Sequence, residues 1–171
     1  MKYIRLFSQH GRLVTLPQIT AVIGQQEEPD EEQVVDQYVQ LILAPEFGDI
    51  CMRPSEDEHY FFSRHFIVES YASRWLAIRR GEVLQTLVSQ VREASCKHNA
   101  VVEESVLGYK PYELDSEGIA ALREQLAAEP ECNDVAYAIN ENGAGYFYST
   151  RGLNANYAKV LADYDPYRWS F

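Results

Sequence analysis

The strand-like segments of this chain come in groups, and amphipathic helix-like segments lie between the groups. A stripe of apolar residues at helical spacing runs from Val83 to Ala94, whereas other apolar stretches are short or alternate with polar residues. The order along the chain is β-α-β-β-β-(α)-α-β-α-β-β-α, with no regular alternation of one strand and one helix. This order argues against a doubly wound parallel sheet. It predicts an α+β fold, with one mainly antiparallel sheet and helices packed on one face.

The length of the chain, 171 residues, is that of one domain. We therefore expect a single α+β domain over residues 1–171, with no internal repeat. The stretch at about residues 25–33 is acidic and contains Pro29, so it predicts a long loop between elements.

Several elements carry local signals of their own. Thr15 and Gln18 form a capping-box pattern ahead of a short helix, and Asp115 is placed to cap a later one. Asn142-Gly143 between two apolar runs predicts a hairpin. Residues 2–8 alternate, which predicts a strand or hairpin. The remaining expectations are strands at 37–44, 49–53 and 60–68, an element at 71–80 that fits either helix or strand, a helix at 82–97, a strand at 100–107 and a helix at 153–164.

Cysteine and apolar content indicate the compartment. The three cysteines, Cys51, Cys96 and Cys132, are odd in number and form no Cys-x-x-Cys pair, which favours a reducing compartment over a disulfide scaffold. No apolar run approaches the roughly 20 residues that span a bilayer. The first residues also lack the apolar run of a signal peptide. We expect a cytoplasmic protein that does not enter a membrane.

No residue pattern indicates catalysis. His59 and His65 are the only histidines close in sequence, and on one strand they would lie about 20 Å apart, too far to share an ion. Cys132 stands among acidic residues that disfavour a thiolate. The chain contains neither a nucleophile elbow nor a phosphate-binding loop. We therefore expect no catalytic residue, no metal and no cofactor, and the sequence favours a protein that is not an enzyme.

Charge is the strongest functional signal. The net charge is −11, which argues against direct nucleic-acid binding or attachment to an anionic membrane. Residues 27–36 hold six acids and no base, and a second acidic cluster lies at 56–58. A solvated acidic loop and a surface that faces a cationic partner both fit this pattern. Aromatic residues gather near the end of the chain, where Tyr167 and Trp169 suit either a core or an interface.

These features together predict a non-enzymatic acidic binding protein of the inhibitor or immunity type. Its partner would be a basic protein, such as a toxin or a nucleic-acid-binding protein, which it would neutralise; in one variant of this hypothesis its carboxylates mimic nucleic acid. The expected partner-binding residues are Glu27, Glu28, Asp30, Glu31, Glu32, Glu56, Asp57, Glu58, Tyr167 and Trp169.

An alternative interpretation uses the basic middle of the chain. Residues 64–97 hold six bases and three acids. A small enzyme or ligand-binding module could bind an anionic substrate there. The residues concerned are Arg64, His65, Arg74, Arg79 and Arg80.

Overall fold

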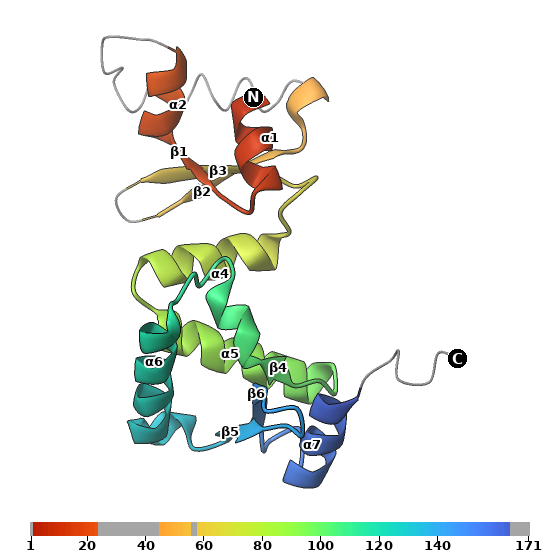
Figure 1. Ribbon diagram of the computed structural model, residues 1–171. Helices are drawn as coiled ribbons and strands as arrows, with labels where there is room; N and C mark the ends of the chain where they lie inside the picture. The colour runs from red at the N-terminus through yellow and green to blue at the C-terminus, as the bar shows by residue number, and fades with distance from the viewer. Residues whose placement is uncertain (1, 24–44, 56–57, 165–171) are drawn as a thin grey trace. The chain divides into compact units, whose positions relative to one another are not determined.

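The computed structural model describes residues 2–23, 45–55 and 58–164 of the chain (Figure 1). Its contacts divide into two compact units, Met1–Leu76 (unit 1) and Ala77–Phe171 (unit 2). Within the described part, no helix combines the length and the apolar character needed to cross a bilayer.

Unit 1 is a three-stranded antiparallel sheet with helices on both faces. Its elements are α1 (Lys2–Gln9), β1 (Val14–Thr15), α2 (Leu16–Ile23), η1 (Pro45–Phe47), β2 (Ile50–Pro54), β3 (His59–Ser63) and the first eight residues of α4 (Glu69–Arg79), whose last three residues fall in unit 2. The strand order is β1-β3-β2. Phe61 of β3 packs with residues of α1 and α2, while its neighbour Phe62 packs with residues of α4. Because successive strand residues point to opposite faces, this alternation places one helical layer on each side.

Unit 2 is built in the same way. Its elements are α5 (Val83–Lys97), β4 (Val102–Glu103), η2 (Glu104–Gly108), α6 (Ser116–Ala128), η3 (Pro130–Cys132), β5 (Val135–Ile139), β6 (Gly145–Ser149) and α7 (Ala155–Asp163). The strand order is β4-β6-β5, again antiparallel.

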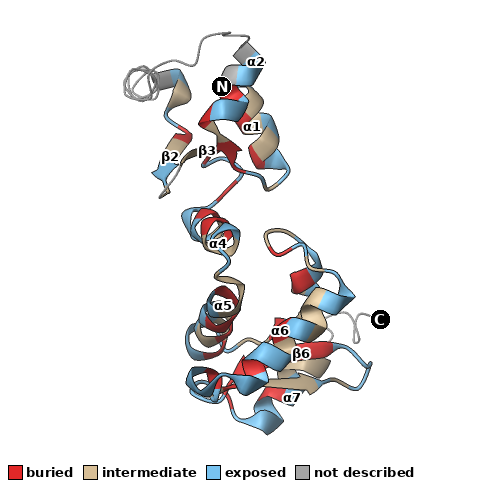
Figure 2. Ribbon diagram, turned by 90° about the vertical axis from the view of Figure 1, so that its left-hand side faces the viewer, coloured by how far each residue is buried: buried red, intermediate tan, exposed pale blue. Residues whose placement is uncertain are grey.

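The central strand of unit 2 is buried along its whole length. All five residues of β6 are buried, and Figure 2 shows the strand in the colour of buried residues. Phe147 packs on one face with α5 and α6, and Tyr146 and Tyr148 pack on the other with Ala158 of α7. The sheet is therefore a middle layer between helices.

The α+β class and the antiparallel pairing are confirmed. The strands form two sheets where the sequence predicted one, and each sheet has helices on both faces. The predicted helix at 82–97, the capped helix after Asp115 and the hairpin around Asn142-Gly143 are also confirmed. The strand predicted at 37–44 and the loop predicted at 25–33 lie outside the described residues.

Three local predictions need correction. Residues 2–9 are a helix and not a strand, because Ile4 and Ser8 at spacing four are the residues that it buries. The strand predicted over 60–68 ends at Ser63, where the chain turns. The strand predicted over 100–107 is only two residues long and continues as a 3₁₀ helix.

The expectation of no internal repeat is wrong. A set of five residues recurs 86 positions later: Tyr60, Phe61, Ser63, Tyr71 and Ala72 return as Tyr146, Phe147, Ser149, Tyr157 and Ala158. The motif Pro-Glu-x-x-Asp at Pro45 likewise returns at Pro130. Strand register agrees, since Val14 pairs with Phe61 as Val102 pairs with Phe147. Units 1 and 2 are two copies of one arrangement.

Candidate functional site

A polar cluster of the same four side chains lies in each unit. Its members are Arg5, Ser8, Asp49 and Ser63 in unit 1, and Arg92, Ser95, Asp134 and Ser149 in unit 2. An arginine, an aspartate and two serines in one place could form a catalytic group, so their geometry decides how they are interpreted.

In unit 2 the aspartate is the centre of the cluster. Arg92 donates to both carboxylate oxygens of Asp134, with N–O distances of 3.0 and 2.5 Å, and also to the Glu131 carbonyl at 2.6 Å. Ser149 Oγ donates to Asp134 Oδ2 at 2.7 Å, while the Ser149 amide donates to Ser95 Oγ at 2.9 Å. These bonds join α5, the segment before β5 and the end of β6.

Unit 1 repeats these bonds one for one. Arg5 donates to Asp49 at 3.0 and 2.5 Å and to the Glu46 carbonyl at 2.8 Å. Ser63 Oγ donates to Asp49 Oδ2 at 2.5 Å, and the Ser63 amide donates to Ser8 Oγ at 2.9 Å.

The geometry fits a structural role better than catalysis. A catalytic serine gives its proton to a base and must reach substrate. Ser63 and Ser149 instead donate to the aspartates, and both are fully buried. His65 Nε2 lies 4.0 Å from Asp49 in unit 1, but the residue at its position in unit 2 is Arg151. The shared part of the cluster therefore fastens a helix to a hairpin.

The arginines hold both aspartates ionised. The hydrogen bonds from Arg92 lower the pKa of Asp134 to about 2 against the opposing effect of burial, and Ser149 lowers it further. The hydrogen bonds from Arg5 lower the pKa of Asp49 in the same direction. Each aspartate therefore stays charged and bound over the physiological pH range.

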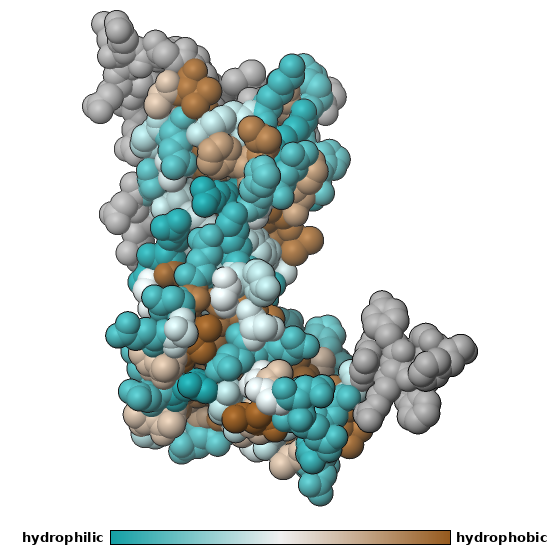
Figure 3. Space-filling view, in the orientation of Figure 1, coloured by the Kyte–Doolittle hydropathy of each residue, from teal (hydrophilic) through white to brown (hydrophobic). Residues whose placement is uncertain are grey.

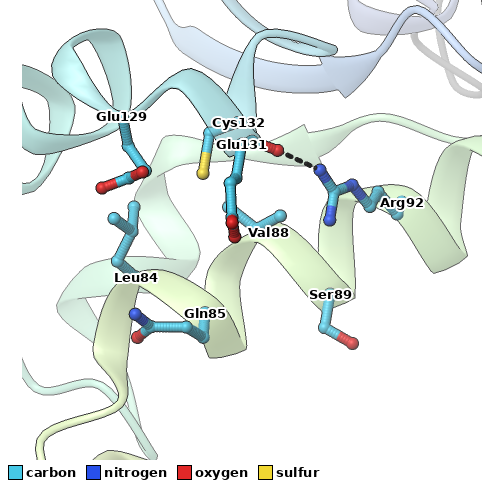
Figure 4. A pocket seen from close by; sticks show the side chains of 8 residues that line it. All are labelled: Leu84, Gln85, Val88, Ser89, Arg92, Glu129, Glu131 and Cys132. Atoms are coloured by element: carbon cyan, nitrogen blue, oxygen red, sulfur yellow. Dashed lines mark hydrogen bonds between the residues drawn. The ribbon is translucent and has the colours of Figure 1, made fainter.

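A hollow beside this cluster in unit 2 is the candidate site (Figure 4). Its volume is about 420 Å³, within the range of ligand pockets. We call it the α5 hollow, and its lining residues are Leu84, Gln85, Val88, Ser89, Arg92, Glu129, Glu131 and Cys132. Five of these lie on one side of α5, and Figure 4 shows the other three on the segment that faces it.

The two walls of the α5 hollow have fixed positions. The bond from Arg92 to the Glu131 carbonyl ties the second wall to α5, and the Cys132 amide donates to the Glu129 carbonyl at 3.0 Å. Burial raises the pKa of the Cys132 thiol, although Arg92 acts in the opposite direction. The sulfur is therefore a neutral thiol in the lining of the hollow. The sequence predicted that Cys132 would not be a thiolate because of its acidic neighbours, and in the structure the main reason is burial.

Most predicted partner-binding residues lie outside the described part of the chain. Those outside are Glu27, Glu28, Asp30, Glu31, Glu32, Glu56, Asp57, Tyr167 and Trp169. Glu58 is described. It lies in the turn between β2 and β3, where its carbonyl accepts from the Ser55 amide at 2.8 Å.

The basic residues of the alternative interpretation are divided between the units. Arg64 donates to the Gly48 carbonyl at 2.9 Å, and Arg74 donates to the Ser70 carbonyl at 3.3 Å, both within unit 1. Arg79 and Arg80 belong to unit 2, where Arg80 pairs with Glu82.

A second group of exposed acidic residues lies on α6 and at its two ends. Residues 113–131, which we call the α6 acidic segment, hold six carboxylates and one base. The base, Arg123, pairs with Glu104 and donates to the Tyr137 hydroxyl. The six carboxylates, all on exposed residues, are Glu113, Asp115, Glu117, Glu124, Glu129 and Glu131.

Neither the exposed apolar residues nor the possible metal ligands of the described chain indicate a second site. Large hydrophobic side chains such as Tyr109 and Tyr164 are exposed, and Figure 3 shows brown residues scattered among hydrophilic ones on the face it draws. Scattered exposure of this kind is ordinary. Among the described residues, no three His, Cys, Asp or Glu side chains are placed to hold a metal ion.

Sequence reasoning could have found part of this site. The repeated Pro-Glu-x-x-Asp motif marks Glu131 and Asp134, and comparison of its two copies shows Phe47 where the second has Cys132. The facing side of α5 carries no such signal.

Comparison with known proteins places the second unit in a family. No curated protein and no solved structure matches the chain. The model of the YdhW C-terminal domain family matches residues 81–169, which cover just over half of the chain and nearly all of unit 2. The chain belongs to the YdhW C-terminal domain family.

Proposed function

We propose that this protein is a non-enzymatic acidic binding protein that neutralises a basic protein partner, in the manner of an inhibitor or immunity protein. The observation that carries the proposal is the α6 acidic segment. Its six exposed carboxylates have only Arg123 among them, and that arginine is engaged elsewhere. A surplus of negative charge on α6 and the residues at its two ends attracts a partner of opposite charge and raises the rate of encounter.

The repeat adds a second argument. The Pro-Glu-x-x-Asp motif begins at Pro45 in the first copy and at Pro130 in the second, and an acidic run precedes it in both sequences. Residues 27–36 hold six acids and no base, and residues 113–129 hold five acids and one base. Two copies that differ at most positions both keep their acidic surplus at this place, so the surplus is a property of the repeated sequence.

The alternative of an anion-binding enzyme or module has less support. Such a site requires several cationic side chains that converge on one ligand. Arg64 and Arg80 instead bind a carbonyl and a carboxylate of their own units. We therefore place the partner-binding surface on the acidic residues.

The test begins with the full chain as bait in a lysate of its native host, followed by identification of the bound proteins by mass spectrometry. The association rate of each candidate is then measured at two salt concentrations. We expect a basic partner whose association slows steeply with salt, because exposed charges act over about 10 Å at 0.1 M salt.

Charge variants locate the surface. Glu113→Gln, Glu117→Gln and Glu124→Gln together should slow association about tenfold at low salt, because steering depends on the summed potential. The matched control removes three exposed carboxylates elsewhere in unit 2, by Glu93→Gln, Glu103→Gln and Glu141→Gln. The control should retain most of the wild-type rate.

The equivalent test in the first copy of the repeat uses four residues, Glu27, Glu28, Glu31 and Glu32. Replacing all four by glutamine should slow association as well, whereas Trp169→Ala should speed dissociation if that ring anchors the complex. A captured partner that is not basic, or equal rates for the α6 variant and its control, contradicts the proposal.

A further inference from the structure

The α5 hollow lies beside a position where the two copies of the repeat carry side chains of different size. Arg5 donates to the Glu46 carbonyl as Arg92 donates to the Glu131 carbonyl, so Phe47 and Cys132, the next residues, are equivalent. The Phe47 ring lies under the Arg5 guanidinium at 6.0 Å and packs on the core of unit 1. Unit 2 has only a thiol at this place, beside a hollow of about 420 Å³.

The lining of the α5 hollow has an apolar part and an acidic part. Leu84, Val88 and the neutral Cys132 provide the apolar surface. Glu129 and Glu131 are exposed, and Figure 4 shows their side chains reaching from the facing segment toward α5. A ligand that fits this lining has an apolar body and a polar end.

The charged groups around the α5 hollow determine whether the polar end of such a ligand is a cation or an anion. The hollow contains one cation, Arg92, which is bound to both oxygens of Asp134. Arg151 also binds Asp134, at 3.0 Å. Together with Glu129 and Glu131, the group has three carboxylates and two guanidinium groups, and Glu131 acts on Arg92 through its charge without a close ion pair among the described contacts. An anion is disfavoured there, and a cation is favoured.

We infer that the α5 hollow receives a lysine or arginine side chain of the protein partner, with its aliphatic stem on Leu84 and Val88 and its cationic end at Glu129 and Glu131. This inference rests on the proposed function, because it names the contact by which a basic partner is held.

The first experiment uses small probes in place of the partner. The full chain, labelled with ¹⁵N, is titrated with n-butylguanidinium, with its neutral isostere n-butylurea, and with hexanoate. The amides of Gln85, Ser89 and Cys132 report on the hollow. We expect saturable shifts with n-butylguanidinium at a Kd about fivefold below that of n-butylurea, because exposed carboxylates contribute modestly in water. Hexanoate should bind more weakly than either.

Two variants test the two parts of the lining. Cys132→Phe copies the residue of unit 1 and should abolish the shifts by filling the hollow. Glu129→Gln with Glu131→Gln changes only exposed residues, so its folding is not at risk, and it should raise the Kd of n-butylguanidinium to that of n-butylurea. The control, Glu117→Gln with Glu124→Gln, makes the same charge change on α6 outside the hollow and should leave the preference in place.

Three results would overturn the inference. They are equal binding of n-butylguanidinium and n-butylurea, preferred binding of hexanoate, and the absence of saturable shifts with every probe. The proposed function fails separately. If a basic partner binds and Cys132→Phe leaves its dissociation rate unchanged, only the inference about the hollow is lost. If the cationic probe binds but no basic partner exists, the proposed function is lost, and the preference of the hollow for a cation is all that remains of the inference.

Discussion

At the scale of single residues, Asp134 is the side chain that joins α5 to the end of β6 in unit 2. Replacing it with asparagine removes the charge that Arg92 and Ser149 bind while keeping the shape of the side chain. Hydrogen bonds to charged groups contribute about 1.5–3 kcal/mol each, so Asp134→Asn should lower the free energy of unfolding by about 2–3 kcal/mol. Urea denaturation measures this change.

The control for Asp134→Asn is another carboxylate paired with a base on the same unit. Lys97 Nζ donates to Glu93 Oε1 at 3.2 Å across one turn of α5, and both side chains are more than half exposed. Exposed pairs of this kind contribute well under about 1 kcal/mol. If Glu93→Gln costs as much as Asp134→Asn, the cluster does not fasten α5 to the hairpin.

The same carboxylate makes stability depend on pH. The pKa of Asp134 is about 2 in the folded protein against an ordinary value of 3.8, so the unfolded chain binds its proton first. The stabilisation is fully present above about pH 4 and is lost as the pH falls toward 2. A shift of this size corresponds to about 2 kcal/mol.

Chemical denaturation of the wild type and of Asp134→Asn, measured at intervals from pH 5 to pH 2, checks this prediction. The wild type should lose more stability than the variant over that range. Asp49, whose pKa is lowered by Arg5, remains in both proteins and contributes the loss that they share. Parallel curves for the two proteins would refute the assignment.

At the scale of elements, α5 is the main helix of the core of unit 2. The sequence stripe predicted Leu87 and Val88 as core residues, and both are buried, with Leu87 only 1% exposed. Leu87→Ala should therefore cost about 2–5 kcal/mol, the range for buried leucines that leave a cavity. Ser89→Ala on the exposed side of the same helix is the control and should change the midpoint of thermal unfolding little.

The sequence predicted well those elements whose apolar residues have a spacing that fits only a helix or only a strand. The stripe of α5 has no strand interpretation, and Asp115 caps α6 as expected, accepting from the Gly118 amide at 2.8 Å. Residues 2–8 fit the period of a strand and that of a helix. Tyr3 and Phe7 lie on the same face of a strand, and they also lie about one turn apart on the same face of a helix. Their rings lie 4.4 Å apart in the helix. Tertiary packing decided a choice that local pattern left open.

The candidate site was the harder part to predict. Glu129 and Glu131 are two carboxylates among 26 acidic residues, and nothing local separates them from the others. Their significance depends on the contact between η3 and α5, which Arg92 makes from 39 positions away. The repeated Pro-Glu-x-x-Asp motif, with Phe47 in one copy and Cys132 in the other, marks the place in the sequence, and it has this meaning only once the repeat is recognised.

At the scale of the whole molecule, the repeat explains why one chain contains two sheets. Each unit carries a complete set of its own parts: a helix on each face, three strands and one arginine–aspartate–serine cluster. The family match begins at residue 81 and so follows one copy of the repeat. A unit that contains all of its own core residues is expected to fold by itself.

This leads to a prediction for the fragment of residues 77–171. Both hydrophobic cores of unit 2 consist of residues from Ile78 onward, and they surround the fully buried β6. A chain of 95 residues with one continuous sheet buries enough surface for cooperative folding, with a free energy of unfolding of about 5–10 kcal/mol. The purified fragment should show helical circular dichroism and a single sigmoidal urea transition, which Leu87→Ala should shift to lower urea. A broad transition without a baseline, or one that Leu87→Ala leaves in place, would show that unit 2 is a compact part of a larger domain and cannot fold without unit 1.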